Sequence, residues 1–360
     1  MPNEVPRPRR ATLLVALCVV LASCGAPSLP SPPGSPTPSV MRTPSAAPGT
    51  STEAWHIATS IALHPASLGV LATQAADGAL WVAIAGTPAG HVYRYDLARG
   101  TLLSVADVGW APASLAVLGA QAWIADGPGD GSQPGLRANR VEAIDTTSGR
   151  VEFSIPVPAP GQLLAAFDAL WITSSGALHD AVYRLNPTTR ALTKAIPLPG
   201  RVAALSEALG RVWIVTVSGG QGSETLIPLD PATGRPGLPL DLGGRQVTPV
   251  VGVDGRLETL TSAASAASGV TLLRIDPATG SIAPLATWTG VQASRLYADG
   301  VYLVTGGSRL EVRSLMDGQV LDSVAPVPDL DGGGLIDIDH TPAGYWFVGG
   351  MAAVLLSPSQ

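Results

Sequence analysis

Short apolar segments, divided by glycine and proline, recur along most of the chain, and seven of them share a common pattern. Six are centred on an aromatic residue: Leu80-Trp81-Val82, Ala122-Trp123-Ile124, Leu170-Trp171-Ile172, Val212-Trp213-Ile214, Val301-Tyr302-Leu303 and Tyr345-Trp346-Phe347. The remaining one, residues 256–260, has Glu258 at its centre. Successive centres are 42, 48, 42, 45, 44 and 44 residues apart, a period typical of four-stranded propeller blades. We therefore predict an all-β fold, a seven-bladed β-propeller whose aromatic rings pack between neighbouring blades.

A second repeated motif follows the aromatic segments and ends in a turn sequence. It occurs at residues 93–100, 142–149, 183–187, 227–234 and 273–280, with an Asp or Asn before Pro-Ala-Thr-Gly or a similar run. The side-chain oxygen of Asp or Asn can accept backbone N–H groups, Pro fixes φ, and Gly adopts the left-handed conformation. We predict that each motif is a hairpin joining the third and fourth strands of a blade.

The two ends of the repeat region are complementary. The last unit has an inner strand near 335–338, an aromatic strand at 345–348 and a third strand at 353–356, but no fourth strand. A spare alternating segment, residues 55–61, precedes the first inner strand, which we place at 68–73. We therefore predict that the N-terminal strand joins the last blade, closes the ring and removes an open sheet edge.

Taken together, the aromatic strand and the Tyr-Arg-x-Asp-Pro-Ala-Thr-Gly type of hairpin resemble the repeats of the YVTN, NHL and streptogramin-lyase-like bacterial propellers. The resemblance extends over nearly all of residues 54–360 and concerns motifs that specify a fold. For the lyase members it implies a metal-dependent site of two histidines and a glutamate at the channel mouth. This chain has no matching Glu-x-His placement, so no site residue is transferred from that group.

The first 23 residues have the layout of a secretory signal. Arg7, Arg9 and Arg10 precede an apolar run at 11–22 that is too short to span a membrane. The run ends in Leu21-Ala22-Ser23-Cys24, which resembles the lipobox of bacterial lipoproteins. That resemblance implies cleavage before Cys24 and a diacylglyceryl group on its sulfur. An ordinary signal in which Cys24 is incidental is the alternative.

Residues 25–53 contain eight Pro and six Ser with almost no charge. Such a segment cannot bury enough apolar surface to offset chain entropy, and we predict a disordered tether. The predicted organisation is a lipoprotein signal peptide at 1–23, a lipidated cysteine and tether at 24–53, and a propeller domain at 54–360. The predicted location is the cell membrane, where acyl chains would anchor the protein on its extracytoplasmic side.

The amino-acid composition excludes several kinds of site and partner for the repeat domain. Charged residues make up 13% of the chain, about half the usual ~25%, and helices with charged outer faces are therefore disfavoured. Both cysteines, Cys18 and Cys24, lie in the N-terminal region, so the domain has no thiol for a disulfide, a zinc site or a nucleophile. The formal net charge of −6 disfavours nucleic acid as a partner.

Loop residues at one end of the predicted blades are candidates for a binding face. Two histidines each lie just before a predicted third strand, and the longest loop after an aromatic strand runs from Asp126 to Asn139. A further histidine belongs to an acidic cluster near the C-terminus. The candidate binding-face residues are His91, His179, Asp126, Asp130, Arg137 and His340.

The acidic cluster surrounds the run Gly332–Gly334 and gives candidates for a divalent cation site at Asp329, Asp331 and Asp337. An Asp-x-Asp pair before a glycine run is similar to the start of a calcium loop, but the later acidic ligand is missing. A solvated loop is the alternative interpretation. We identify no other cofactor motif.

Two functions are compatible with these observations. One is a membrane-anchored extracytoplasmic propeller that acts as a binding or scaffold module, taking a protein, glycan or small-molecule ligand on its loop-rich face. The other is an extracytoplasmic lyase or hydrolase with an active site at the central channel mouth. Because the sequence has no Gly-x-Ser-x-Gly nucleophile turn and no HExxH metal motif, it assigns no catalytic residue and favours the binding module.

Overall fold

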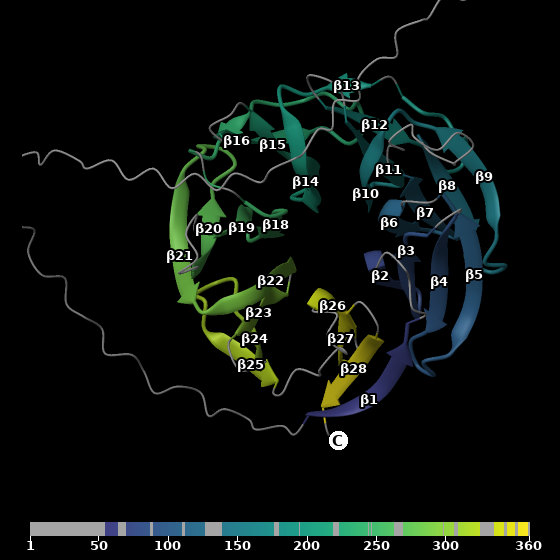
Figure 1. Cartoon of the computed structure of the whole chain (residues 1–360). Helices are drawn as coiled ribbons and strands as arrows, with labels where there is room; N and C mark the ends of the chain where they lie inside the picture. Colours follow the sequence, from purple (N-terminus) through teal and green to yellow (C-terminus); the bar gives the residue numbers. More distant parts are fainter. Residues whose placement is uncertain are drawn as a thin grey trace, which may run out of the picture. The chain divides into compact units, whose positions relative to one another are not determined.

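The computed structural model describes most of the predicted propeller domain. The described residues are 55–63, 70–86, 89–109, 112–126, 139–175, 180–193, 195–218, 223–243, 245, 247–262, 269–297, 299–305, 309–324, 335–341, 344–349 and 352–358. They form seven sheets of four antiparallel strands each, and Figure 1 shows these sheets arranged in a ring. Within this part of the chain, no helix is long and apolar enough to cross a membrane. The predicted seven-bladed, all-β propeller is confirmed.

In blades 1 to 6 the strands run from the centre to the rim in chain order. Blade 1 contains β2 (Val70–Ala76), β3 (Ala79–Ile84), β4 (Gly90–Asp96) and β5 (Leu102–Val108). Blade 2 contains β6 (Pro112–Leu118), β7 (Gln121–Asp126), β8 (Arg140–Asp145) and β9 (Val151–Pro156). Blade 3 contains β10 (Pro160–Ala166), β11 (Ala169–Ser174), β12 (Ala181–Leu185) and β13 (Ile196–Pro197). Blade 4 contains β14 (Arg201–Ala208), β15 (Arg211–Ser218), β16 (Ser223–Leu229) and β17 (Leu240–Asp241).

The second half of the ring continues this arrangement until the last blade. Blade 5 contains β18 (Val251–Val253), β19 (Arg256–Ser262), β20 (Gly269–Ile275) and β21 (Ile282–Thr289). Blade 6 contains β22 (Val291–Tyr297), β23 (Gly300–Thr305), β24 (Arg309–Arg313) and β25 (Val320–Val324). Blade 7 contains β26 (Leu335–Thr341), β27 (Gly344–Gly349), β28 (Ala352–Pro358) and, at the rim, β1 (Trp55–Ala62).

The ring is closed by the N-terminal strand. β1 pairs antiparallel with β28, with a register that runs from Trp55 opposite Pro358 to Ala62 opposite Ala352. This pairing confirms the predicted closure of the last blade. The first inner strand differs from the prediction of 68–73, because β2 continues as far as Ala76. It ends there at the tight turn made by the two residues that follow.

Glycine-containing turns set the first hairpin of several blades. In the turn after β2, Asp77 and Gly78 have φ of 51° and 71°. The turn after β18 is similar, with Asp254 at 47° and Gly255 at 74°. Two successive residues with positive φ are typical of type I′ turns, whose twist matches that of the flanking strands. These turns lie at the end of the sheets that we call the turn face.

The predicted hairpins between third and fourth strands are also confirmed, and they lie at the turn face. In blade 1, Asp96 Oδ1 accepts the backbone N–H groups of Ala98 and Arg99, both at 2.8 Å. The same pair of bonds recurs at Asp145, Asn186, Asp230 and Asp276. Blade 6 has a sixth turn, not predicted from the sequence, in which the Ser314 hydroxyl accepts the N–H of Met316.

The repeated aromatic residues pack between blades, as predicted. Each lies in a second strand and exposes at most 3% of its surface. Trp81 of blade 1 packs against Leu115 and Ile124 of blade 2, and the corresponding residues of the other blades have equivalent neighbours. The ring is therefore held by one hydrophobic cluster at each of these blade boundaries.

Blade 5 uses a charged pair where the other blades use a ring. Glu258 in β19 is fully buried and lies directly opposite Arg274 in β20. Arg274 Nε donates to Glu258 Oε1 at 2.9 Å, and its Nη2 donates to the carbonyl oxygen of Leu315 in blade 6 at 3.3 Å. Glu258, which replaces the aromatic residue, thus still contributes through Arg274 to the contact between two blades.

Candidate functional site

One end of the sheets, which we call the loop face, carries the connections from second to third strands and from each blade to the next. It corresponds to the loop-rich face predicted from the sequence. Of the predicted binding-face residues, His91 and Asp126 lie there within the described structure. His179, Asp130 and Arg137 lie outside the described residues. His340 belongs to β26, where it pairs with Tyr345 next to the β26–β27 connection, at the end of the sheet opposite to His91.

His91 forms a surface pair with the neighbouring strand. Its Nδ1 lies 2.9 Å from Asp107 Oδ1, and the two side chains are 39% and 74% exposed. The imidazole also contacts the edge of Tyr93, with ring centroids 6.0 Å apart. Because both members are exposed, this pair is available to a ligand on the loop face, although it adds little to stability.

Asp126 contributes to the packing of blade 2. It is fully buried, and Glu142 on the adjacent strand is 2% exposed. Arg140 Nε lies 3.0 Å from Glu142 Oε1 and 3.8 Å from Asp126 Oδ2. Glu142 Oε2 also accepts the N–H of Gly109 in the connection from blade 1 at 3.1 Å. The predicted loop residue Asp126 therefore belongs to a buried ionic cluster that fastens one blade to the next.

Two other buried carboxylates hold connections between blades on the loop face. Asp180 Oδ2 accepts the N–H of Val202 at 2.8 Å, and Glu224 Oε2 accepts the N–H of Val247 at 2.7 Å. Each carboxylate lies at the start of a third strand; Asp180 binds the beginning of the next blade's inner strand, β14, and Glu224 binds the segment that precedes β18. Burial raises the pKa of Glu224, and the bond from Val247 lowers it in part.

A pocket of about 280 Å³ lies beside Glu224 on the loop face. It spans three blades, because its walls come from β16, the connection before β18, the facing ends of β19 and β20, and β22. Its lining residues are Glu224, Val247, Thr248, Leu260, Thr261, Val270 and Ser294. The pocket thus combines one carboxylate and three hydroxyl groups with an apolar wall, as small-ligand sites commonly do.

Two larger hollows lie on the turn face. One, of about 680 Å³, lies between blades 2 and 3 and includes Asp145, Asp168 and Arg190. The Asp145 carboxylate there already accepts hydrogen bonds from backbone N–H groups of its own turn. The other, of about 580 Å³, lies between blades 4 and 5, and its lining includes Leu238 and Pro239. We take the Glu224 pocket as the candidate site because it has a buried ionisable group in its wall.

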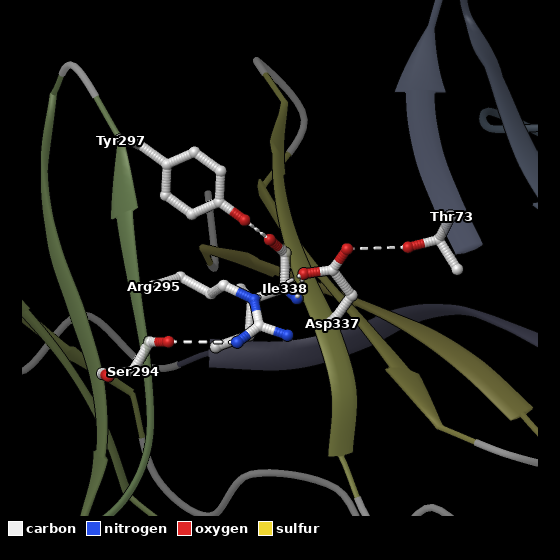
Figure 2. Close-up of polar contacts among 6 residues, drawn as sticks. All are labelled: Thr73, Ser294, Arg295, Tyr297, Asp337 and Ile338. Atoms are coloured by element: carbon white, nitrogen blue, oxygen red, sulfur yellow. Dashed lines mark hydrogen bonds and ion pairs between the residues drawn. The ribbon is translucent and has the colours of Figure 1, made fainter. Parts of the chain in front are cut away.

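The inner strands of three consecutive blades are joined by a polar network (Figure 2). Asp337 in β26 lies between its partners: Oδ1 accepts Arg295 Nε of β22, and Oδ2 accepts the Thr73 hydroxyl of β2, both at 2.8 Å. The Tyr297 hydroxyl donates to the carbonyl oxygen of Ile338. Since blade 7 lies between blades 6 and 1, this network connects both sides of the blade that contains the two ends of the domain.

The network bears on the predicted cation site. Asp337 is paired with a guanidinium, which compensates its charge and opposes the approach of a second cation. Asp329 and Asp331 lie outside the described residues. Among the residues that the structure describes, no three His, Cys, Asp or Glu side chains are grouped as they would be around a metal ion.

No protein-family model matches this chain. None of the curated proteins matches its sequence. Solved structures do match: a chain of hydrazine synthase from Kuenenia stuttgartiensis has a TM-score of 0.55 at 13% identity, covering 70% of this chain and 78% of that chain. BamB from Moraxella catarrhalis has a TM-score of 0.49 at 12% identity, covering 84% of this chain and 97% of that chain. At 13% identity, the likeness to hydrazine synthase shows the propeller fold alone.

The contacts between inner strands were not predicted, although the sequence contains a signal for them. Arg295 and Asp337 are 42 residues apart, close to the repeat period. Gln74 and Val117 are 43 residues apart, and the Gln74 side-chain oxygen accepts the Val117 N–H at 2.9 Å. Residues one period apart on inner strands face each other in a closed ring. Glu224 has a simpler signal, because it is the one charged residue of β16, whose last four residues are apolar.

Proposed function

We propose that the protein is a membrane-anchored extracytoplasmic propeller that acts as a binding or scaffold module through its loop face. The observation that carries this proposal is the Glu224 pocket, which three blades build at that face. A closed ring of packed blades is a rigid support, and binding residues are often held on the loops of such supports. His91 and Asp107 would add exposed polar groups to the same face.

The anchoring part of the proposal is supported by the N-terminal sequence. A basic stretch, a short apolar run and Leu21-Ala22-Ser23-Cys24 are followed by a Pro- and Ser-rich segment. Cleavage before Cys24 and attachment of more than one acyl chain would hold the protein durably at the membrane. The segment up to residue 53 would act as a spacer between the anchor and the propeller.

The binding role is tested by placing a photoreactive amino acid at one exposed residue of each face in the full chain. Ser175 is exposed on the loop face in blade 3, and Ala278 is exposed on the turn face in blade 5. After irradiation of intact cells, we expect a protein or glycan adduct from position 175 and none from position 278. Adducts from position 278 alone, or equal adducts from both positions, would contradict the proposed use of the loop face, and no adduct from either position would contradict a protein or glycan partner there.

The anchor is tested separately by replacing Cys24 with Ser and following the protein through cell fractionation and metabolic labelling with an alkyne fatty acid. We expect the variant to lose the label and to leave the membrane fraction. Cys18→Ser, which changes the chain's other cysteine, is the matched control and should behave as the wild type. Retention of label and membrane association by Cys24→Ser would rule out lipidation at this residue.

A further inference from the structure

The Glu224 pocket has an unbalanced charge. Glu224 is 4% exposed, and no Lys, Arg or His belongs to the described lining of the pocket. The Val247 N–H engages only Oε2 of the carboxylate, so Oε1 is the acceptor that a ligand would reach. A buried carboxylate is stabilised when a cation comes within hydrogen-bond distance. The pocket is therefore complementary to a positively charged hydrogen-bond donor.

The other residues that line the pocket indicate the chemistry of the rest of the ligand. Val247, Leu260 and Val270 form an apolar wall, with Leu260 1% and Val270 9% exposed. The Thr248 hydroxyl is already occupied, since it accepts the N–H of Leu260 at 3.2 Å. Thr261 and Ser294 add hydroxyl groups that can accept further N–H bonds. A volume of about 280 Å³ admits only a small molecule.

We propose that this pocket binds a small organic cation, namely a primary ammonium group on a short aliphatic body. The ammonium would donate to Glu224 Oε1 and to the hydroxyl of Thr261, while the aliphatic body would extend over Val247 toward Val270 and Ser294. A metal ion is less well matched, because the described pocket offers a single carboxylate. The inference names a ligand class for the loop face and so rests on the proposed binding role.

The test uses the full chain purified in detergent, with n-butylammonium chloride as the probe in isothermal titration calorimetry. 1-Butanol is the matched ligand, because it has the same aliphatic body without the charge. We expect butylammonium to bind, and 1-butanol to bind about tenfold more weakly or not at all. Absence of butylammonium binding, or equal binding of the two probes, would overturn the assignment.

Variants distinguish the pocket from nonspecific charge effects. Glu224→Gln keeps an oxygen for the Val247 N–H and should weaken butylammonium binding about tenfold or more. Glu207→Gln makes the same change at an exposed residue of the same blade and should bind as the wild type. Full binding by Glu224→Gln would contradict the proposal.

A second variant covers the case in which Glu224→Gln does not fold. Ser294→Leu places an aliphatic side chain in the pocket and leaves Glu224 in place. It should lose butylammonium binding while its thermal unfolding stays close to that of the wild type, and unimpaired binding would overturn the assignment. If position 175 still gives adducts while butylammonium does not bind, the ligand class alone is wrong and the proposed use of the loop face stands.

Discussion

At the scale of single residues, Arg274 is the clearest case of one side chain that links two blades. Arginine occupies the same third-strand position in blades 1 and 3, where Arg94 lies 5.3 Å from the centroid of Trp81 and Arg184 lies 6.0 Å from that of Trp171. In blade 5 its partner is the buried Glu258. The arginine is thus common to these three blades, while its partner changes from a ring to a carboxylate.

Removing this guanidinium should leave a buried charge without compensation. We expect Arg274→Met to lower the free energy of unfolding by about 3 kcal/mol at pH 7. Arg184→Met, at the equivalent position over Trp171, should cost only about 1 kcal/mol. Urea unfolding of the two variants gives the comparison, and similar losses in both would contradict the assigned role of Glu258.

The same variant should respond to pH in a defined direction. Burial raises the pKa of Glu258 above its ordinary 4.5, and Arg274 opposes this rise. A raised pKa means that the folded state holds the proton more tightly, so stability falls as the pH rises from 4.5 through the folded value. Without Arg274 the pKa rises further, and the destabilisation of Arg274→Met should be larger at pH 8 than at pH 5. A loss that is the same at both pH values would contradict this account.

At the scale of strands and turns, the hairpins between third and fourth strands share one hydrogen-bond pattern, which either Asp or Asn can make. Asp96, Asp145, Asp230 and Asp276 each accept two backbone N–H groups, and Asn186 does the same without a charge. Those N–H groups hold the pKa of each aspartate below its ordinary 3.8. The turn geometry therefore requires the oxygen, while the charge adds a dependence on pH.

Replacing the four aspartates with asparagine should separate the two contributions. A lowered pKa stabilises the fold above the ordinary value, and this contribution is lost as the pH falls through 3.8 and below. We expect the fourfold variant to be less stable to urea than the wild type at pH 7, because it lacks this contribution, and to lose less stability than the wild type between pH 5 and pH 3. Asp276→Ala, which removes the acceptor itself, should be destabilised at pH 7. An equal acid sensitivity in the fourfold variant would contradict this assignment.

Second strands and turns could be predicted because their signals are local. A ring at one position of each repeat must be buried, and an Asp or Asn before Gly specifies a turn within a few residues. The fourth strands had no such signal: β13 and β17 are two residues long, β13 includes Pro197, and β17 directly follows Pro239. Proline cannot donate a ladder hydrogen bond, so the outer edges of these blades depend on tertiary packing.

At the scale of the whole molecule, blade 7 holds the ring together, because it contains both ends of the domain. β1 completes its sheet at the rim, and the Arg295–Asp337–Thr73 network joins its inner strand to the blades on either side.

Deleting residues 54–63 should expose the edge of β28 and lower the melting temperature sharply. Calorimetry checks this, with deletion of the predicted spacer 25–49 as the control. An unchanged melting curve for the first deletion would argue against closure by β1.

The candidate site could not be predicted to the same extent, because no local pattern marks it. Thr73 and Asp337 are 264 residues apart and meet only because the ring closes. The Glu224 pocket likewise takes residues from three blades. Hydroxyl-bearing residues such as Thr261 and Ser294 are common in the sequence, and they acquire a role only through the neighbours that the fold provides.

The pairing of Trp55 with Pro358 has a consequence for biogenesis. During synthesis the first strand of the domain emerges long before its partner, and it must wait for nearly the entire chain. Contacts between such distant residues close late and slow folding. Until then β1 lacks its partner, and the edges of the unfinished ring remain exposed to other chains. A chain truncated before Ala352 lacks β28 altogether, so such a truncation would prevent completion of the whole ring.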